Sequence, residues 1–174
     1  MENISSLTAI SPIDGRYRKV THPLYSYFSE YALMRYRVLV ELEYFIALCK
    51  IPLPQLENID QGLLEEIKKV YVDFSEEDAA QIKEIEKTTN HDVKAVEYFV
   101  RGKLKNYGLE SYGSFVHFGL TSQDANNTAI PLMLMEALND IIYPSVGQAI
   151  NKLNEMSIEW ASVPMLARTH GQPA

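Results

Sequence analysis

The chain of 174 residues contains a single cysteine, Cys49, which excludes an internal disulfide and any zinc site built from several cysteines. Basic residues are also few: 16 Lys and Arg against 23 Asp and Glu give a net charge of −7, which argues against sequence-independent nucleic-acid binding. No run reaches the ~18 apolar residues of a membrane span, and MENISSLTAI at the start lacks the features of a secretory signal. We therefore expect a cytoplasmic protein with no nucleic-acid or membrane partner.

The motifs of several enzyme classes are absent as well. The four histidines, His22, His91, His117 and His170, do not form a zinc-binding spacing. The sequence also has no Gly-x-Ser-x-Gly nucleophile motif and no glycine-rich loop of the kinds that bind phosphate. We therefore expect neither a metal nor a cofactor.

The hydrophobic pattern predicts an all-α fold. A long, mostly apolar helix is expected over residues 29–50, and its few, scattered charges indicate that it is buried on more than one side. Shorter helices are expected over 63–74, from a capping box at Ser75 to about residue 90, and over 92–106. Together they make up a predicted N-terminal helical domain, residues 1–110.

A connector over residues 111–120 leads into a longer helical segment, which is expected to extend to about residue 162. Its apolar residues recur every seven positions, as in a helix of a bundle seam. The two rows are Met135, Ile142, Ala149 and Met156, and Val146, Leu153 and Trp160. Pro131 should kink this helix, and Pro144 should bend it rather than end it. Residues 111–174 are therefore predicted to begin a helical-bundle domain, and the abrupt end at Gly-Gln-Pro-Ala leads us to expect a part of a longer protein.

Three polar segments interrupt the apolar pattern: residues 88–92, 117–127 and 168–173. The first segment has two interpretations. As a structural feature, Thr89 or Asn90 caps the helix that follows. As a site, Asn90 and Asp92 hydrogen-bond a substrate, while His91 carries a proton or stabilises an oxyanion. Because helix caps are common, the pattern alone favours the structural interpretation.

The second polar segment fits a helix N-terminus capped by Thr121 or Ser122, and such a terminus also suits a phosphate or a carboxylate. The third segment is ordinary as a surface loop but costly if buried, and His170 taken alone is more typical of an exposed loop. The residues by themselves leave these interpretations open.

Five runs occur together and in the same order in one known family. They are SPIDGRY at 11–17, FSEED at 74–78, KTTNHDVKAVE at 87–97, HFGLTSQDANN at 117–127 and RTHGQPA at 168–174. Over essentially its whole length the chain resembles the N-terminal part of the adenylosuccinate lyase family, within the fumarase/aspartase superfamily, and in particular its bacterial branch. The last run alone marks the superfamily weakly, whereas all five together are specific.

The resemblance implies a fold with long bundled helices and a β-elimination reaction. A base removes a proton from the succinyl group of a purine nucleotide or of its imidazole precursor, an acid protonates the departing nitrogen, and fumarate leaves. The C–H group is a very weak acid, so fixed donors must stabilise the carboxylate on which charge develops. Protonation of the nitrogen near neutral pH favours a histidine.

The resemblance also assigns roles to individual residues. His170 matches the general acid. Substrate contacts are implied for Arg16, Tyr17, Asn90, His91, Asp92, Thr121 and Ser122, and supporting positions for His117, Gln123 and Asp124. Arg16 and Tyr17 match contacts to the nucleotide, and Thr121 and Ser122 match donors to the succinyl carboxylate. The guanidinium of Arg16 suits a carboxylate or a phosphate.

The family's base is a serine in a Ser-Ser-x-Met-Pro-x-Lys-x-Asn loop, and this sequence contains no such run. In the family, three subunits of a homotetramer contribute to each active site. We therefore expect these 174 residues alone to be inactive. Two alternatives stay open: another lyase of the superfamily, such as argininosuccinate lyase, aspartase or fumarase, or a non-catalytic helical assembly domain, which the heptad rows fit equally well.

Overall fold

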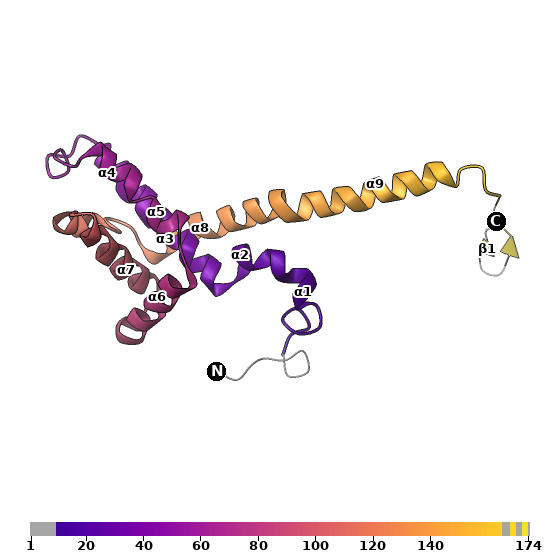
Figure 1. Ribbon diagram of the computed structural model, residues 1–174, viewed down its shortest axis with the longest axis horizontal. Helices are drawn as coiled ribbons and strands as arrows, with labels where there is room; N and C mark the ends of the chain where they lie inside the picture. The colour runs from indigo at the N-terminus through magenta and orange to yellow at the C-terminus, as the bar shows by residue number, and fades with distance from the viewer. Residues whose placement is uncertain (1–9, 165–167, 170–171, 174) are drawn as a thin grey trace. The chain divides into compact units, whose positions relative to one another are not determined.

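The computed structural model describes residues 10–164, 168–169 and 172–173 (Figure 1). Its α-helices are α1 (Arg18–Thr21), α2 (Tyr25–Phe28), α3 (Glu30–Cys49), α4 (Gln61–Glu66), α5 (Lys69–Val72), α6 (Glu76–Thr89), α7 (Asp92–Asn106), α8 (Ser122–Ala137) and α9 (Tyr143–Glu159). Two 3-10 helices, η1 (His22–Leu24) and η2 (Glu110–Phe115), and a π-helical turn, η3 (Leu138–Ile142), complete the helical elements of this part of the chain. The predicted all-α class is confirmed.

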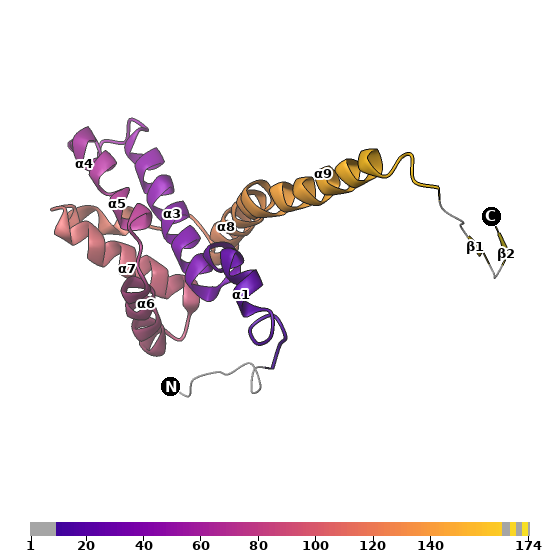
Figure 2. The ribbon, with the colours of Figure 1, turned by 45° about the vertical axis from the view of Figure 1, so that its right-hand side comes forward.

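The helix α3 organises the first compact unit of the chain, which ends at Ala137. Ser29 caps it by accepting a hydrogen bond from the Ala32 N–H at 3.1 Å. One face of α3 packs with α4 to α7 in the main core, and another packs against α2 and α8 in a smaller core. Figures 1 and 2 both show α3 between the α6–α7 pair and α8. Burial on more than one side is therefore confirmed.

The helices α6 and α7 form an antiparallel pair joined by two residues. Ser75 and Asp78 make the predicted capping box at the start of α6. At its other end, Asn90 adopts the left-handed conformation with φ 50°, which asparagine tolerates better than most residues. α7 spans the predicted residues, and Gly108 follows it at φ 72°. The junction at residues 89–92 is therefore a sharp turn between two well-ended helices.

Two local expectations were wrong. The helix expected over 63–74 is divided into α4 and α5 by a turn at residues 67–68. The cap expected from Thr89 or Asn90 comes instead from the imidazole of His91, which accepts a hydrogen bond from the Lys94 N–H. Asn90 cannot serve as that cap because it already ends α6.

The predicted long segment is helical from 122 to 159, as α8, η3 and α9 in succession. Pro131 lies inside α8, and Pro144 lies in the first turn of α9, where its missing N–H is tolerated. The second compact unit begins at Leu138 and ends with two-residue strands, β1 (Arg168–Thr169) and β2 (Gln172–Pro173), paired antiparallel with Arg168 opposite Pro173. The domain boundary at 110/111 stays a prediction.

Candidate active site at the start of α7 and α8

A pocket of about 410 Å³ opens beside the α6–α7 junction. Three elements of the first unit form it: α3, the end of α6 and the junction itself. The residues that line it are Glu30, Leu33, Met34, Arg37, Ile82, Glu86, Asn90, His91 and Asp92. The three junction residues that the sequence marked as substrate contacts therefore share one pocket, and Arg37 lies with them.

His91 connects the first polar segment to the second. Its Nδ1 accepts a hydrogen bond from the Lys94 N–H at 3.1 Å, and its Nε2 lies 3.4 Å from the Ser122 hydroxyl. Because Nδ1 accepts, the neutral ring carries its hydrogen on Nε2 and donates it to Ser122. Ser122 Oγ accepts in this contact, so its own hydrogen can be donated to an anion. His91 is exposed and Ser122 is partly exposed, so a ligand can reach both side chains.

Arg37 holds the other side of this cluster together. Its guanidinium lies 2.9 Å from Asp92 Oδ2, and its Nε donates to Asn126 Oδ1 at 2.9 Å. The Arg37 residue is only 6% exposed, so one buried cation links α3, α7 and α8. Partial burial of Asp92 favours a higher pKa, but the Val93 N–H and Arg37 together hold the pKa of this carboxyl below its usual value. Asp92 is therefore a fixed carboxylate.

At the start of α8, the carboxylate of Asp124 binds Thr121, the residue that precedes the helix. Asp124 Oδ2 accepts from the Thr121 N–H at 2.7 Å and from the Thr121 hydroxyl at 2.8 Å. These two donors lower the pKa of the Asp124 carboxyl. Gln123 donates to Asn127 Oδ1 at 2.6 Å, one turn further along. The two groups of Thr121 that the resemblance directs at a carboxylate thus already bind a carboxylate, that of Asp124.

His117 lies in the connector before α8 and contacts a buried acid. Its Nδ1 is 2.5 Å from Glu41 Oε1, and Glu41 has no exposed surface. Burial raises the pKa of Glu41, and the bond from His117 opposes this only in part. The backbone of His117 is left-handed, at φ 60°. His117 therefore lies in a constrained position immediately before the polar turn.

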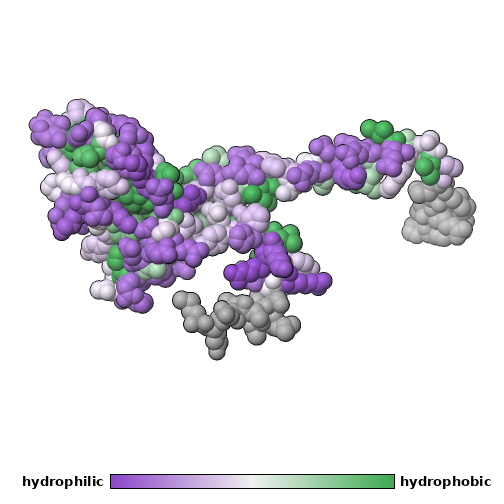
Figure 3. All heavy atoms as spheres, viewed as in Figure 1, coloured by the Kyte–Doolittle hydropathy of each residue, from purple (hydrophilic) through white to green (hydrophobic). Residues whose placement is uncertain are grey.

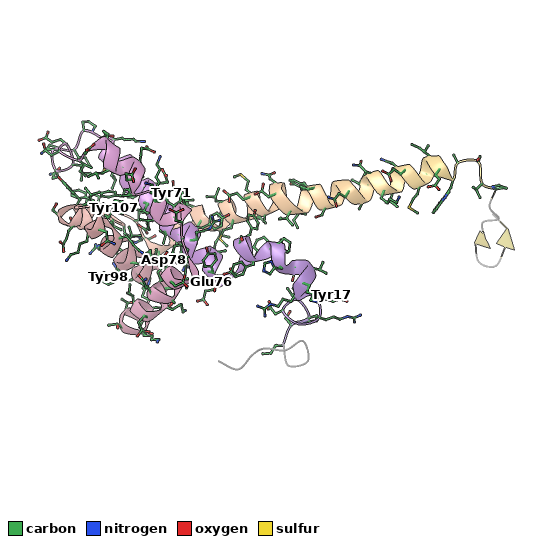
Figure 4. All side chains as sticks on the ribbon, in the orientation of Figure 1. Tyr17, Tyr71, Glu76, Asp78, Tyr98 and Tyr107 are labelled. Carbon is green, nitrogen blue, oxygen red and sulfur yellow. The ribbon has the colours of Figure 1, made fainter. Side chains whose placement is uncertain are left out.

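Other predicted site residues do not join this cluster. Arg16 stacks over the ring of Tyr17, with its guanidinium carbon 5.3 Å from the ring centroid, and both are exposed. Figure 4 shows Tyr17 beside α1, away from the labelled residues of α6 and α7. His170 lies outside the described residues, so its assignment as general acid stays a prediction.

Arg37 and Glu41 belong to the site, although the motifs did not predict either of them. A usable signal was present: the two charges are four residues apart, so they share one face of a helix whose neighbouring residues are apolar. Charged side chains are rarely buried without a specific partner, so a charged stripe on a buried helix indicates a polar contact. Their partners, Asp92, Asn126 and His117, lie far along the chain and could not be inferred.

The described residues contain no group of three or more His, Cys, Asp or Glu side chains placed to hold a metal ion. Among the helices described here, none combines the length and the apolar composition that a membrane crossing requires.

Comparison with known proteins agrees with the resemblance read from the motifs. A family model described as "Lyase" matches residues 15–174. The chain is 51% identical to an adenylosuccinate lyase from Dictyostelium discoideum, and 42% identical to those from Escherichia coli K12 and Legionella pneumophila strain Corby. Each match covers 98% of this chain, which spans 38% of the length of these curated relatives. The similarity is thus not limited to the bacterial branch.

The family match spans all three polar segments, from before the α6–α7 junction to the last run of the sequence. The relatives at 40–51% identity bear the name that the five motif runs indicated. The predicted resemblance is therefore confirmed, and the chain belongs to the lyase family.

Proposed function

We propose that the protein to which this chain belongs is an adenylosuccinate lyase of purine nucleotide biosynthesis. It releases fumarate from adenylosuccinate to give AMP, and it acts in the same way on the succinylated imidazole-carboxamide ribonucleotide. Similarity to relatives with this name supports the substrate class. The observation that carries the proposal is the contact between His91 Nε2 and Ser122 Oγ, because it joins two of the polar segments shared with the family.

The proposed reaction is a β-elimination that needs no oxidant, reductant or water. A base takes the proton from the succinyl Cβ, and the electron pair left on that carbon is delocalised into the adjacent carboxylate. This pair then forms the double bond of fumarate as the Cα–N bond breaks, and an acid supplies a proton to the nitrogen. Donors fixed in advance around the carboxylate lower the barrier, because they need not reorganise as charge develops.

Each residue has a proposed role in this chemistry. His170 is the general acid at the nitrogen, and Arg16 and Tyr17 contact the nucleotide. Ser122 donates to the succinyl carboxylate, together with Thr121 when Asp124 gives up its two hydrogen bonds. Further substrate contacts come from Asn90, His91 and Asp92, and support from His117, Gln123 and Asp124.

We further propose that the complete enzyme is a cytoplasmic homotetramer that requires no cofactor and binds no nucleic acid. Apolar side chains on α9 and directly after it support the assembly, since Val146, Leu153 and Trp160 are each at least half exposed. Figure 3 shows apolar patches on the visible surface of this segment. Large exposed apolar residues in a row are typical of a surface that another subunit covers. In such an assembly, Arg16 and Tyr17 of one subunit complete the pocket of another.

The activity is tested with the full-length protein and two substrates. A change in absorbance is expected with adenylosuccinate, and no change is expected with argininosuccinate, which the sister enzyme would cleave to fumarate and arginine. His170→Gln keeps a side chain of similar size but cannot act as an acid, so kcat should fall by about 10²- to 10⁴-fold. An unchanged rate in this variant would contradict the assignment of His170.

The 174 residues alone are predicted to be inactive, because they lack the serine loop from which the family takes its base. The measurement is fumarate release by the purified 174-residue chain, compared with its His170→Ala variant. Release above that control would show that these residues contain a base of their own.

A further inference from the structure

Three polar residues on α3 lie on one face and reach the segment that leads into α8. Arg37, Glu41 and Tyr44 are spaced by four and three residues, which places them on one side of a helix. Arg37 donates to Asn126 inside α8, and Glu41 contacts His117. The Tyr44 hydroxyl donates to the Phe118 carbonyl at 2.8 Å. α3 thus contacts α8 and the connector before it through three side chains, one on each successive turn of the helix.

The contact in the middle is the most buried of the three. Glu41 has no exposed surface, and its Oε1 lies 2.5 Å from His117 Nδ1. Its other oxygen, Oε2, is buried and has no hydrogen-bond partner among the described residues. His117 is therefore the group that satisfies this carboxylate, and the carboxylate in turn fixes which nitrogen of the ring faces α3.

The connector needs such a contact because its backbone is unfavourable. Both His117 and Gly119 are left-handed, at φ 60° and 72°. Glycine adopts this conformation without a steric penalty, whereas a histidine does not. A further bond, from the Leu120 N–H to the His117 carbonyl at 3.2 Å, closes the turn immediately before Thr121. Without a contact to hold its side chain, His117 would favour an extended or right-handed backbone.

We propose that Glu41 is a positioning residue: through His117 it holds the 117–121 turn, and so places Ser122 beside His91. Glu41 does not touch substrate. Its effect on substrate binding rests on the proposed function, whereas its effect on the turn does not. The 3.4 Å contact between Ser122 and His91 is the geometry that this support maintains.

The turn is tested by amide hydrogen exchange in the full-length protein. Glu41→Leu keeps the volume of the side chain but removes the acceptor, and exchange over residues 116–124 should become about tenfold faster. Glu41→Gln keeps an oxygen that accepts from Nδ1, and should stay near the wild-type rate. Glu43→Leu is the matched control, because Glu43 lies on the same helix and instead accepts from Tyr71, at 2.6 Å. It should leave residues 116–124 unchanged.

Kinetics with adenylosuccinate gives the second readout. Glu41→Leu should lower kcat/KM by about 100-fold, mainly through KM, and Glu41→Gln should restore most of the loss. If exchange over 116–124 is the same in Glu41→Leu as in wild type, the proposal is wrong, whatever the activity. If Glu41→Gln loosens the turn as much as Glu41→Leu, the hydrogen bond is not what holds it, and the proposal is also wrong.

If Glu41→Leu fails to fold, His117→Phe breaks the same contact from the other side, because a phenyl ring cannot donate to Glu41. Faster exchange confined to residues 116–124 would support a turn held from α3, and unchanged exchange there would overturn it. If the wild-type protein has no lyase activity, the proposed function fails, and the exchange result still decides the structural role of Glu41.

Discussion

Arg37 links three helices of the polar cluster. It is almost fully buried, yet one guanidinium binds an acid on α7 and an amide on α8. A charged group taken out of water is tolerated only when its hydrogens find partners, and breaking such a pair leaves the other groups unpaired. The half-exposed position of Asp92 moderates this cost, since water can reach that carboxylate.

Replacement of Arg37 by leucine should lower the free energy of unfolding by about 2 kcal/mol, because two hydrogen bonds of a buried cation are lost. Arg37→Lys retains the charge but cannot reach both partners, so its loss should be smaller. Urea unfolding at pH 7 measures both. Arg35→Leu is the control on the same helix, since Arg35 instead lies over the Tyr36 ring, 4.5 Å from its centroid. Equal losses in the two leucine variants would contradict the role of Arg37.

At the level of single residues, the sequence predicted which polar residues interrupt the apolar helical pattern. It did not predict which of them contact one another. Asn90, His91 and Asp92 were identified as a group because they are consecutive in an otherwise helical pattern. The contacts from Glu41 to His117 and from Arg37 to Asn126 span 76 and 89 positions. Only the packing of α3 against the start of α8 brings them together, and no local pattern encodes that packing.

Among the elements, α6 begins at a capping box that its own sequence encodes. Ser75 accepts from the Asp78 N–H at 3.2 Å, and Asp78 accepts in return from the Ser75 N–H at 3.0 Å. Asp78 also forms an ion pair with Lys103 of α7, at 2.6 Å. Figure 4 shows Glu76 and Asp78 close together at this end of the helix. The cap therefore also ties α6 to its partner helix.

This cap predicts a pH-dependent stability. Burial raises the pKa of Asp78, but the bonds from Lys103 and Ser75 outweigh it, so the pKa is lower in the folded protein than in the unfolded chain. The stabilisation is therefore complete above the unfolded value of about 4, and is lost as pH falls through the folded value. Asp78→Asn should cost about 1 to 2 kcal/mol at pH 7 and little once the pH lies below the pKa of Asp78 in the folded protein.

The measurement for Asp78→Asn is urea unfolding at several pH values. Glu77→Gln is the control, because Glu77 lies in the same first turn without a part in the capping box. A deficit in Asp78→Asn that stays constant from pH 7 to the lowest pH at which the protein folds would show that the carboxylate charge is not involved.

Elements with strong local signals were predicted well, and those with weak signals were not. The capping box, the left-handed Gly108 and the periodic apolar positions of α3 and α7 all fix structure locally. Residues 63–74 have a helical apolar spacing, but the chain turns at 67–68, where Ile67 is buried in the main core. Packing of Ile67 is a property of the whole core, which the spacing does not reveal.

At the scale of the whole molecule, α9 in the second unit has a row of exposed apolar side chains. None of its residues is buried, and its larger apolar residues include Tyr143, Val146, Ile150 and Leu153. A helix that buries nothing among the described residues gains no stability from its apolar face until a partner covers it. The heptad rows therefore predict that this helix packs against other subunits and not against the rest of its own chain.

Replacement of Leu153 by aspartate should dissociate the proposed tetramer, because it places a charge in the centre of one apolar row. Light scattering coupled to size-exclusion chromatography of the full-length protein should report a smaller mass for this variant. Asn154→Asp adds the same charge one position along the helix, outside the row, and should leave the mass unchanged. If Leu153→Asp keeps the wild-type mass, the heptad row does not form the interface between subunits.

The cap that His91 provides to α7 limits how this residue can take part in catalysis. Since Nδ1 is engaged by the Lys94 N–H, exchangeable hydrogen can enter and leave the ring only at Nε2, toward Ser122. His91 therefore cannot serve as a relay that takes up a proton at one ring nitrogen and releases one from the other. Any chemistry at His91 must begin and end on the same atom, and a route through both nitrogens would require the first turn of α7 to open.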